Sequence, residues 1–113
     1  MQLTTAFILF IAASVTSGWK FTGWVDKNYQ GYVAISRSGV PATTDKPCVN
    51  IAAYNNKLSS YKWDQGDNSQ CQFKLYDSYG CKDQLLASSY ADKNAPAISG
   101  AYDNKASSLW VDC

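Results

Sequence analysis

The hydrophobic and polar positions of this chain alternate over short stretches, as they do in β-strands. Residues 20–25 and 31–35 read as two strands on either side of a polar turn, and residues 71–76 alternate strictly. No stretch has the spacing of a long amphipathic helix. Aromatic and β-branched residues are frequent, and turn-forming clusters recur at residues 38–41, 77–80 and 94–96. The pattern therefore predicts an all-β sandwich.

Two stretches of the chain, 48 positions apart, have similar sequences: residues 53–64 read AYNNKLSSYKWD and residues 101–112 read AYDNKASSLWVD. A match of this kind predicts an internal repeat. Each unit, at about 45 residues, is small for a core of its own, so the two units should share one core. We place motif 1 at about residues 19–66 and motif 2 at about residues 70–113, with the polar residues 65–69 as the connection.

The strand after each pair of serines has a core face and an opposite face. The core face should carry Tyr61, Trp63, Leu109 and Val111. Lys62 and Trp110 then point the other way. Trp110 is either exposed, as a surface for a sugar or cell-wall ligand, or covered by a loop or a neighbouring side chain. Trp19 either contacts a ligand or belongs to a disordered end of the chain.

The composition is that of one ordinary globular domain: 113 residues, 46% apolar, with a net charge of +1. This charge balance points neither to nucleic acid nor to an anionic membrane. Residues 1–18 contain an uncharged apolar run over residues 6–15, followed by small residues, although no Lys or Arg precedes it. The run is shorter than the roughly 20 residues that span a bilayer. We therefore interpret residues 1–18 as a secretory signal, and the protein as extracellular.

Four cysteines, Cys48, Cys71, Cys81 and Cys113, are an even number in a short secreted chain, which predicts two disulfides. A metal site built on them is disfavoured, since the sequence has no histidine and no CxxC spacing. Three pairings are possible, and we favour Cys71–Cys81 with Cys48–Cys113. Each bridge would stabilise a small domain by roughly 2–4 kcal/mol.

Residues 24–31 have the order aromatic, four residues, aromatic, one residue, glycine, given by Trp24, Tyr29 and Gly31. This spacing resembles the first hairpin of the Greek-key motif in the βγ-crystallin family. In such a hairpin the two aromatic rings pack together, and the glycine adopts a backbone conformation that a Cβ would penalise. In the second half, Cys81 and Asp83 stand where the second aromatic and the glycine are expected. A disulfide from Cys81 to Cys71 could hold that hairpin instead.

The repeated phrase also resembles the calcium-binding motif of this family, which has two Asn or Asp residues, two variable residues, Ser or Thr, and then Ser. Residues 55–60 (NNKLSS) and 103–108 (DNKASS) both satisfy it. The resemblance covers residues 19–113 and is that of a secreted member of microbial or fungal type. It implies two four-stranded Greek-key motifs packed as one disulfide-stapled sandwich, with Ca²⁺ bound at two loop sites.

Calcium takes about 6–8 oxygen ligands, which amides, hydroxyls and backbone carbonyls can supply. By resemblance, the direct ligands are the hydroxyls of Ser59 and Ser107 and the backbone carbonyls of Lys57 and Lys105. Further oxygens are expected from the hairpins near Lys27 and Tyr79, with both motifs contributing to each site. The remaining motif residues, which order the loops or add ligands, are Asn55, Asn56, Asp103 and Asn104. The alternative is that the amides only form turns and the serines only begin strands.

The affinity of these sites is expected to be low, on the order of 10⁻⁴–10⁻³ M, as in extracellular calcium modules. The chain contains no glutamate, and the first phrase has no carboxylate. The second phrase contains Asp103 and is expected to bind more tightly.

Catalysis has little support in the sequence, because it has no histidine, no HExxH and no G-x-S-x-G motif. We therefore expect a non-enzymatic protein without nucleic-acid binding or membrane insertion. The alternative function is an antimicrobial protein, like the killer toxins that share this architecture, acting on the cell walls or membranes of competitors or hosts. Its partner would be a cell-wall polysaccharide or a protein target.

Overall fold

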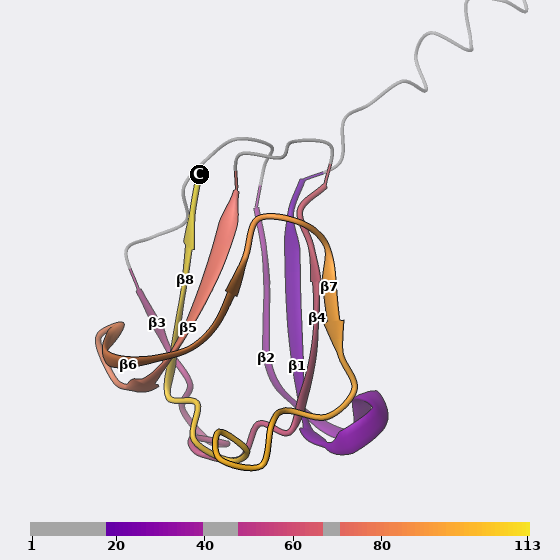
Figure 1. The fold of residues 1–113 in the computed structure, drawn as a ribbon, viewed down its shortest axis with the longest axis vertical. Helices are drawn as coiled ribbons and strands as arrows, with labels where there is room; N and C mark the ends of the chain where they lie inside the picture. Colours follow the sequence, from indigo (N-terminus) through magenta and orange to yellow (C-terminus); the bar gives the residue numbers. More distant parts are fainter. Residues whose placement is uncertain (1–17, 40–47, 67–70) are drawn as a thin grey trace, which may run out of the picture.

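The computed structural model describes residues 18–39, 48–66 and 71–113. Within these ranges the strands of motif 1 are β1 (Lys20–Asp26), β2 (Gln30–Ser38), β3 (Val49–Asn50) and β4 (Ser60–Asp64), and the short helical turn η2 (Lys27–Tyr29) joins β1 to β2. The strands of motif 2 are β5 (Gln72–Ser78), β6 (Lys82–Ser89), β7 (Lys93–Ala95) and β8 (Ser108–Asp112). They form two four-stranded antiparallel sheets that stand side by side (Figure 1). The predicted all-β sandwich of two four-stranded motifs is confirmed.

The two motifs exchange one strand each. The order of the first sheet is β2-β1-β4-β7, and that of the second is β3-β8-β5-β6. Strand β3 of motif 1 therefore pairs with β8 of motif 2, and β7 of motif 2 pairs with β4 of motif 1. Because each sheet needs a strand from the other motif, the two halves interlock around one shared core, as the short repeat predicted.

The core between the sheets is rich in aromatic rings. Phe73 lies 5.2–5.3 Å, between ring centroids, from Phe21, Tyr61 and Trp63. Tyr61, Trp63, Leu109 and Val111 are all buried, which confirms the core face predicted from alternation. Trp19 also belongs to this core: it is 1% exposed and its ring centroid is 6.1 Å from that of Trp63. Both sequence-based alternatives for Trp19, a contact residue or a disordered end, are therefore wrong.

The cysteines pair differently from the arrangement we favoured. Cys71 is bonded to Cys113, with their Cα atoms 4.0 Å apart, and Cys48 is bonded to Cys81, with a Cα separation of 5.9 Å. Strand β5, seven residues long, lies between Cys71 and Cys81, and at roughly 3.3 Å per residue it holds them at opposite ends. Cys71 instead lies beside Cys113 because β5 and β8 pair antiparallel, with the last residue of β8 opposite the first of β5.

The first hairpin has the predicted geometry. The ring of Trp24 meets that of Tyr29 edge-on, with centroids 5.4 Å apart, and Gly31 has a φ of 79°. In the second hairpin Asp83 takes the place of the glycine with a φ of 68°, a conformation that non-glycine residues rarely adopt. Cys81 is held by Cys48, from motif 1, and not by Cys71 as we expected.

Several predictions concern residues outside the described ranges. These are the secretory signal, of which only residue 18 is described, the end of the turn at residues 38–41, and most of the connection at residues 65–69. Within the described ranges, no helix is both long enough and apolar enough to span a bilayer.

Candidate cation sites

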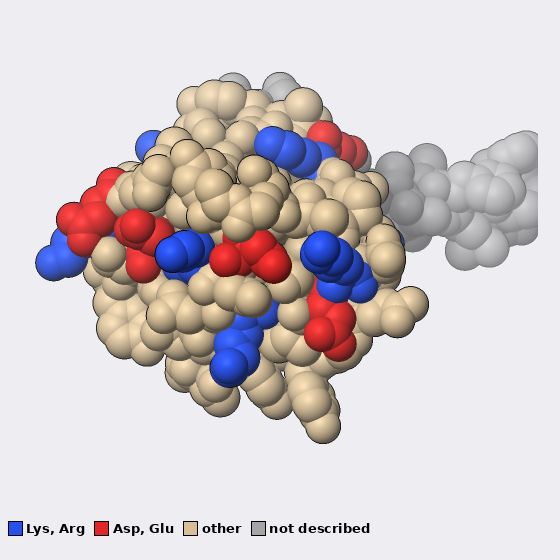
Figure 2. All heavy atoms as spheres, turned by 60° about the horizontal axis from the view of Figure 1, so that its bottom comes forward, with Lys and Arg blue, Asp and Glu red and all other residues tan. Residues whose placement is uncertain are grey.

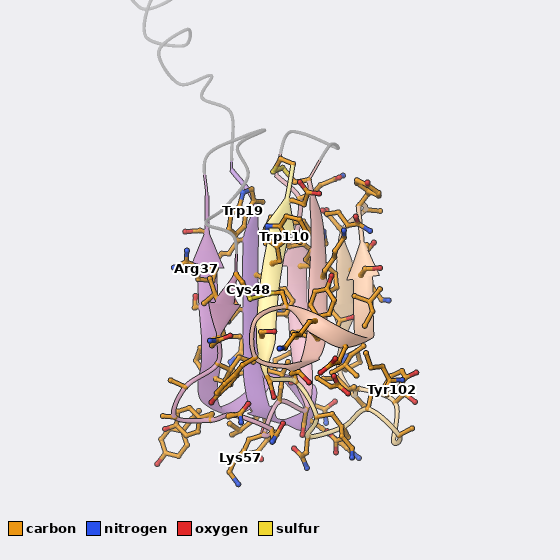
Figure 3. All side chains as sticks on the ribbon, turned by 90° about the vertical axis from the view of Figure 1, so that its left-hand side faces the viewer. Trp19, Arg37, Cys48, Lys57, Tyr102 and Trp110 are labelled. Carbon is orange, nitrogen blue, oxygen red and sulfur yellow. A yellow bond between two sulfur atoms is a disulfide. The ribbon has the colours of Figure 1, made fainter. Side chains whose placement is uncertain are left out.

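The two repeated phrases lie at one end of the sandwich, at the bottom of Figure 1. Figure 3 shows Lys57 of the first phrase and Tyr102 of the second at this same end. Each phrase begins with a turn, at residues 53–56 and 100–104. Asn56 and Asn104 have φ values of 62° and 59°, in the left-handed region that asparagine tolerates better than most residues. Turn formation therefore accounts for the second amide of each phrase.

The turn of motif 2 reaches the first serine of motif 1. The backbone N–H of Asn104 donates to the carbonyl oxygen of Leu58 at 3.1 Å. The hydroxyl of Ser59 donates to Oδ1 of Asn104 at 3.2 Å. Ser59 is 6% exposed whereas Asn104 is exposed, so this contact is partly buried. We call Ser59, Asn104 and the loop around them the Ser59 cluster.

The same arrangement occurs in the opposite direction. The backbone N–H of Asn56 donates to the carbonyl oxygen of Ala106 at 3.0 Å, and the hydroxyl of Ser107 donates to Oδ1 of Asn56 at 3.0 Å. We call this the Ser107 cluster. Each cluster combines a serine from one motif with an asparagine from the other, so both motifs contribute to each.

Each cluster also touches the hairpin of its own sheet. The backbone N–H of Ser59 donates to the carbonyl oxygen of Trp24 at 2.9 Å, and that of Ser107 donates to the carbonyl oxygen of Tyr76 at 2.8 Å. The predicted ligands Lys27 and Tyr79 lie in these two hairpins, and Lys57 and Lys105 each precede a cluster serine by two positions. The structure thus gathers the predicted ligand residues at one end of the molecule, and their coordination of a metal stays a prediction.

The second serine of each pair has a different role, which the sequence did not reveal. The hydroxyl of Ser60 donates to the carbonyl oxygen of Asp26 at 2.6 Å and accepts from the backbone N–H of Tyr29 at 3.0 Å. Ser108 likewise donates to the carbonyl oxygen of Ser78 and accepts from the N–H of Cys81 at 2.9 Å. These hydroxyls hold the hairpins against the sheets. The sequence repeats both serines, which indicates a role for each. Only the first serine of each pair was predicted to have one, as a calcium ligand.

The first position of the motif leaves an oxygen unsatisfied in both halves. Oδ1 of Asn55 and Oδ1 of Asp103 are buried and have no hydrogen-bond partner among the described residues. These two residues occupy equivalent positions of the repeat. Burying a polar oxygen without a partner is unfavourable, by about 1–3 kcal/mol for a neutral group and more for a charged one. A cation bound at each cluster could act as the missing partner.

The donor set at these clusters suits a hard cation. It consists of amide, hydroxyl, carboxylate and backbone carbonyl oxygens, which are the ligands calcium takes. In the part of the chain that the structure describes, no three His, Cys, Asp or Glu side chains form a group that could hold a metal ion. A site here would depend mainly on uncharged oxygens, as the expectation of low affinity requires.

Asp103 lies in the turn that meets Ser59, not in the loop around Ser107. The sequence-based expectation assigned this carboxylate, and with it the tighter binding, to the site of the second phrase. The turn of each phrase lies beside the serine of the other phrase. The carboxylate of Asp103 is therefore in the turn next to the hairpin of motif 1, which has the complete spacing of two aromatics and a glycine. The comparison of affinities therefore applies to the clusters and not to the phrases.

Trp110 is not an exposed ligand surface. It is half-buried, its Nε1 is shielded from solvent and has no hydrogen-bond partner among the described residues, and Nζ of Lys74 lies 5.0 Å from its ring centroid. A neighbouring side chain thus covers it, which is the second of the two alternatives stated above.

The charge at the cluster end of the molecule is mixed. In Figure 2, which turns this end toward the viewer, basic and acidic side chains are interspersed and neither sign forms a large area. This agrees with the net charge of +1.

No protein-family model matches the sequence, and neither does any curated protein. The fold does match solved structures. A βγ-crystallin domain from Flavobacterium johnsoniae has a TM-score of 0.55 and 18% identity, over 80% of this chain and 91% of that one. A βγ-crystallin domain from Clostridium beijerinckii has a TM-score of 0.53 and 17% identity, over 81% and 95%. A double mutant of clostrillin in complex with nickel has a TM-score of 0.54 and 15% identity, over 83% and 98%. This chain therefore has the βγ-crystallin fold, which its hairpin and its repeated phrase had indicated.

Proposed function

We propose that this protein is a secreted, non-enzymatic domain that binds Ca²⁺ at the Ser59 and Ser107 clusters and is stabilised by doing so. The observation that carries the proposal is the pair of buried, unpartnered oxygens on Asn55 and Asp103. They occur at equivalent positions of the repeat, each in a turn whose next residue contacts a serine of the other motif. One solved structure with this fold is a nickel complex of a mutant protein, which supports the idea that the fold can carry a metal site.

Calcium would act as a link between the two motifs. Each cluster draws oxygens from both halves, so a cation held there resists their separation. A ligand that binds only the native state adds RT ln(1 + [L]/Kd), which is about 1.4 kcal/mol per site when calcium is ten times Kd. For a domain of this size, that should raise the melting temperature by roughly 6–11 °C per occupied site.

The test is a thermal melt of the oxidised protein in EGTA and in several millimolar Ca²⁺, with Mg²⁺ as the control ion. We expect a rise with calcium and a smaller one with magnesium, which dehydrates reluctantly and demands octahedral geometry. In the double variant Ser59→Ala, Ser107→Ala, the rise should disappear while the melt in EGTA stays close to that of the parent. If calcium produces neither a thermal shift nor heat in a calorimetric titration, the proposal is wrong.

Secretion rests on the apolar segment at residues 1–18 and agrees with the two disulfides. Expression of the full chain in a secreting host, followed by N-terminal sequencing of the protein in the medium, tests it: the first residue should be 18 or 19. The antimicrobial alternative gains no specific support from the described contacts. It stays a prediction, to be tested by growth inhibition with oxidised and reduced protein.

A further inference from the structure

A hollow of about 400 Å³ lies mainly on the outer face of the sheet β2-β1-β4-β7, and of the core residues only Trp63 contributes to its lining. Strands β1 and β4 form its floor, and the segment leading into β7 forms one side. In the register of this sheet, Thr22 lies beside Lys62 and Lys62 lies beside Asn94, and all three line the hollow. It is thus built mainly from the outward-facing positions of three neighbouring strands.

The hollow is explained by comparing the two halves of the repeat. Trp110 of motif 2 is the equivalent of Lys62, 48 positions earlier, and its large ring lies on the outer face of its own sheet beneath Lys74. Lys62 has a narrow side chain in place of the indole, and its Nζ lies 4.4 Å from the ring centroid of Tyr29. The position that an indole occupies in motif 2 is therefore left open in motif 1.

The lining combines an aromatic ring with charged and uncharged polar groups. Trp24 contributes its indole, held edge-on against Tyr29. Asp64 and Asp92 are oriented by backbone amides: Oδ1 of Asp64 accepts from the N–H of Gly66, and Oδ1 of Asp92 accepts from the N–H of Gln65, both at 2.8 Å. Groups fixed in this way lose little freedom when a ligand binds.

The chemistry of this lining matches a neutral polyhydroxyl ligand. Thr22 and Asn94 can donate and accept hydrogen bonds, and the carboxylates of Asp64 and Asp92 accept them. Two lysines, Lys20 and Lys62, balance the two aspartates, so the hollow has no net charge to attract an anion or a cation. The C–H face of a sugar ring packs on an aromatic side chain. The volume is at the lower end of the roughly 300–1,000 Å³ of ligand pockets, which fits a small molecule.

We propose that this hollow binds a neutral saccharide of one or two rings, with Trp24 as the stacking surface and Thr22, Asp64, Asp92 and Asn94 as hydrogen-bonding partners. This site is separate from the serine clusters, and its occupation does not require calcium. It also replaces Trp110, the surface suggested by the sequence, with a position on the other sheet.

The experiment is an NMR titration of the oxidised protein in EGTA with cellobiose, maltose and N,N′-diacetylchitobiose, up to about 20 mM each. The reporters are the indole N–H signals of Trp24 and Trp110, and the dipeptide lysylglutamate serves as a charged ligand of similar size. For at least one sugar we expect a saturable shift of the Trp24 signal, with the Trp110 signal unchanged and no response to the dipeptide.

Two variants make the test specific. Lys62→Trp places in motif 1 the residue that motif 2 already accommodates, so it should keep the fold, fill the hollow and weaken sugar binding at least about tenfold. Asn94→Ala should weaken binding without filling the hollow. Lys74→Ala, on the opposite sheet, is the matched control and should bind like the parent. The proposal is overturned if no sugar gives a saturable shift, if the dipeptide shifts Trp24 equally, or if Lys62→Trp binds as the parent does.

Discussion

The hydroxyl of Ser60 joins the first hairpin to its sheet, and Ser60→Ala should remove this attachment. Ser60 is fully buried and its Oγ makes two hydrogen bonds, to the carbonyl oxygen of Asp26 and from the N–H of Tyr29. Each bond contributes about 1 kcal/mol, and a buried N–H left without a partner costs about 1–3 kcal/mol. We therefore expect the free energy of unfolding to fall by about 2–4 kcal/mol, a large part of a total that is typically about 5–15 kcal/mol.

The assay is urea unfolding of the oxidised protein in EGTA, followed by tryptophan fluorescence. Ser59→Ala is the matched control, because the neighbouring hydroxyl makes one bond, at 3.2 Å, to the side chain of Asn104. Its removal should cost less than about 1 kcal/mol. Ser108→Ala, the equivalent change in motif 2, should resemble Ser60→Ala. If the adjacent serines give equal losses, or if Ser60→Ala costs less than about 1 kcal/mol, the division of roles between the paired serines is wrong.

Three further predictions concern other parts of the fold. Burial raises the pKa of Tyr61 to about 12, from an ordinary value of 10, so the stability that this phenol contributes is complete below pH 10 and is lost as the pH rises to 12. The free energy of unfolding, measured between pH 8 and pH 12, should show this loss of up to about 3 kcal/mol, and Tyr61→Phe should lack it. Asp83→Gly should stabilise the protein by about 1 kcal/mol in chemical denaturation, because it removes a side chain from the left-handed region of the backbone, whereas Gly31→Ala should be destabilising. A loss of stability in Asp83→Gly would show that the Asp83 side chain has another role. Replacing Cys48 and Cys81 with serine opens a closure of 33 residues and should cost about 4 kcal/mol, and peptide mapping of the oxidised parent should recover these two cysteines in one linked fragment.

The sequence predicted what depends on neighbours along the chain. Alternation placed Tyr61 and Trp63 in the core, and the spacing of Trp24, Tyr29 and Gly31 predicted the first hairpin. These features depend on side-chain period and on local backbone geometry, both of which a single sequence contains.

Contacts between distant segments were harder to predict. The disulfide pairing depends on which strands lie side by side, and Cys71 meets Cys113 because β5 pairs with β8. Alternation assigned Trp110 to the outer face correctly, but the cover provided by Lys74 comes from a neighbouring strand. The hollow was missed because it depends on the space that the side chain of Lys62 leaves on the outer face, which alternation alone does not specify.

The exchange of strands and loops gives this chain the architecture of a symmetric homodimer joined into one polypeptide. One motif alone would complete neither its sheet nor its cluster, whereas two identical copies about a twofold axis would complete both. Once the copies share a chain, each can change independently of the other. Tyr29 and Cys81, or Asn55 and Asp103, are equivalent positions that now differ. A linked pair can thus keep one half as a stable support while the other half acquires a new surface, an option that a true homodimer lacks.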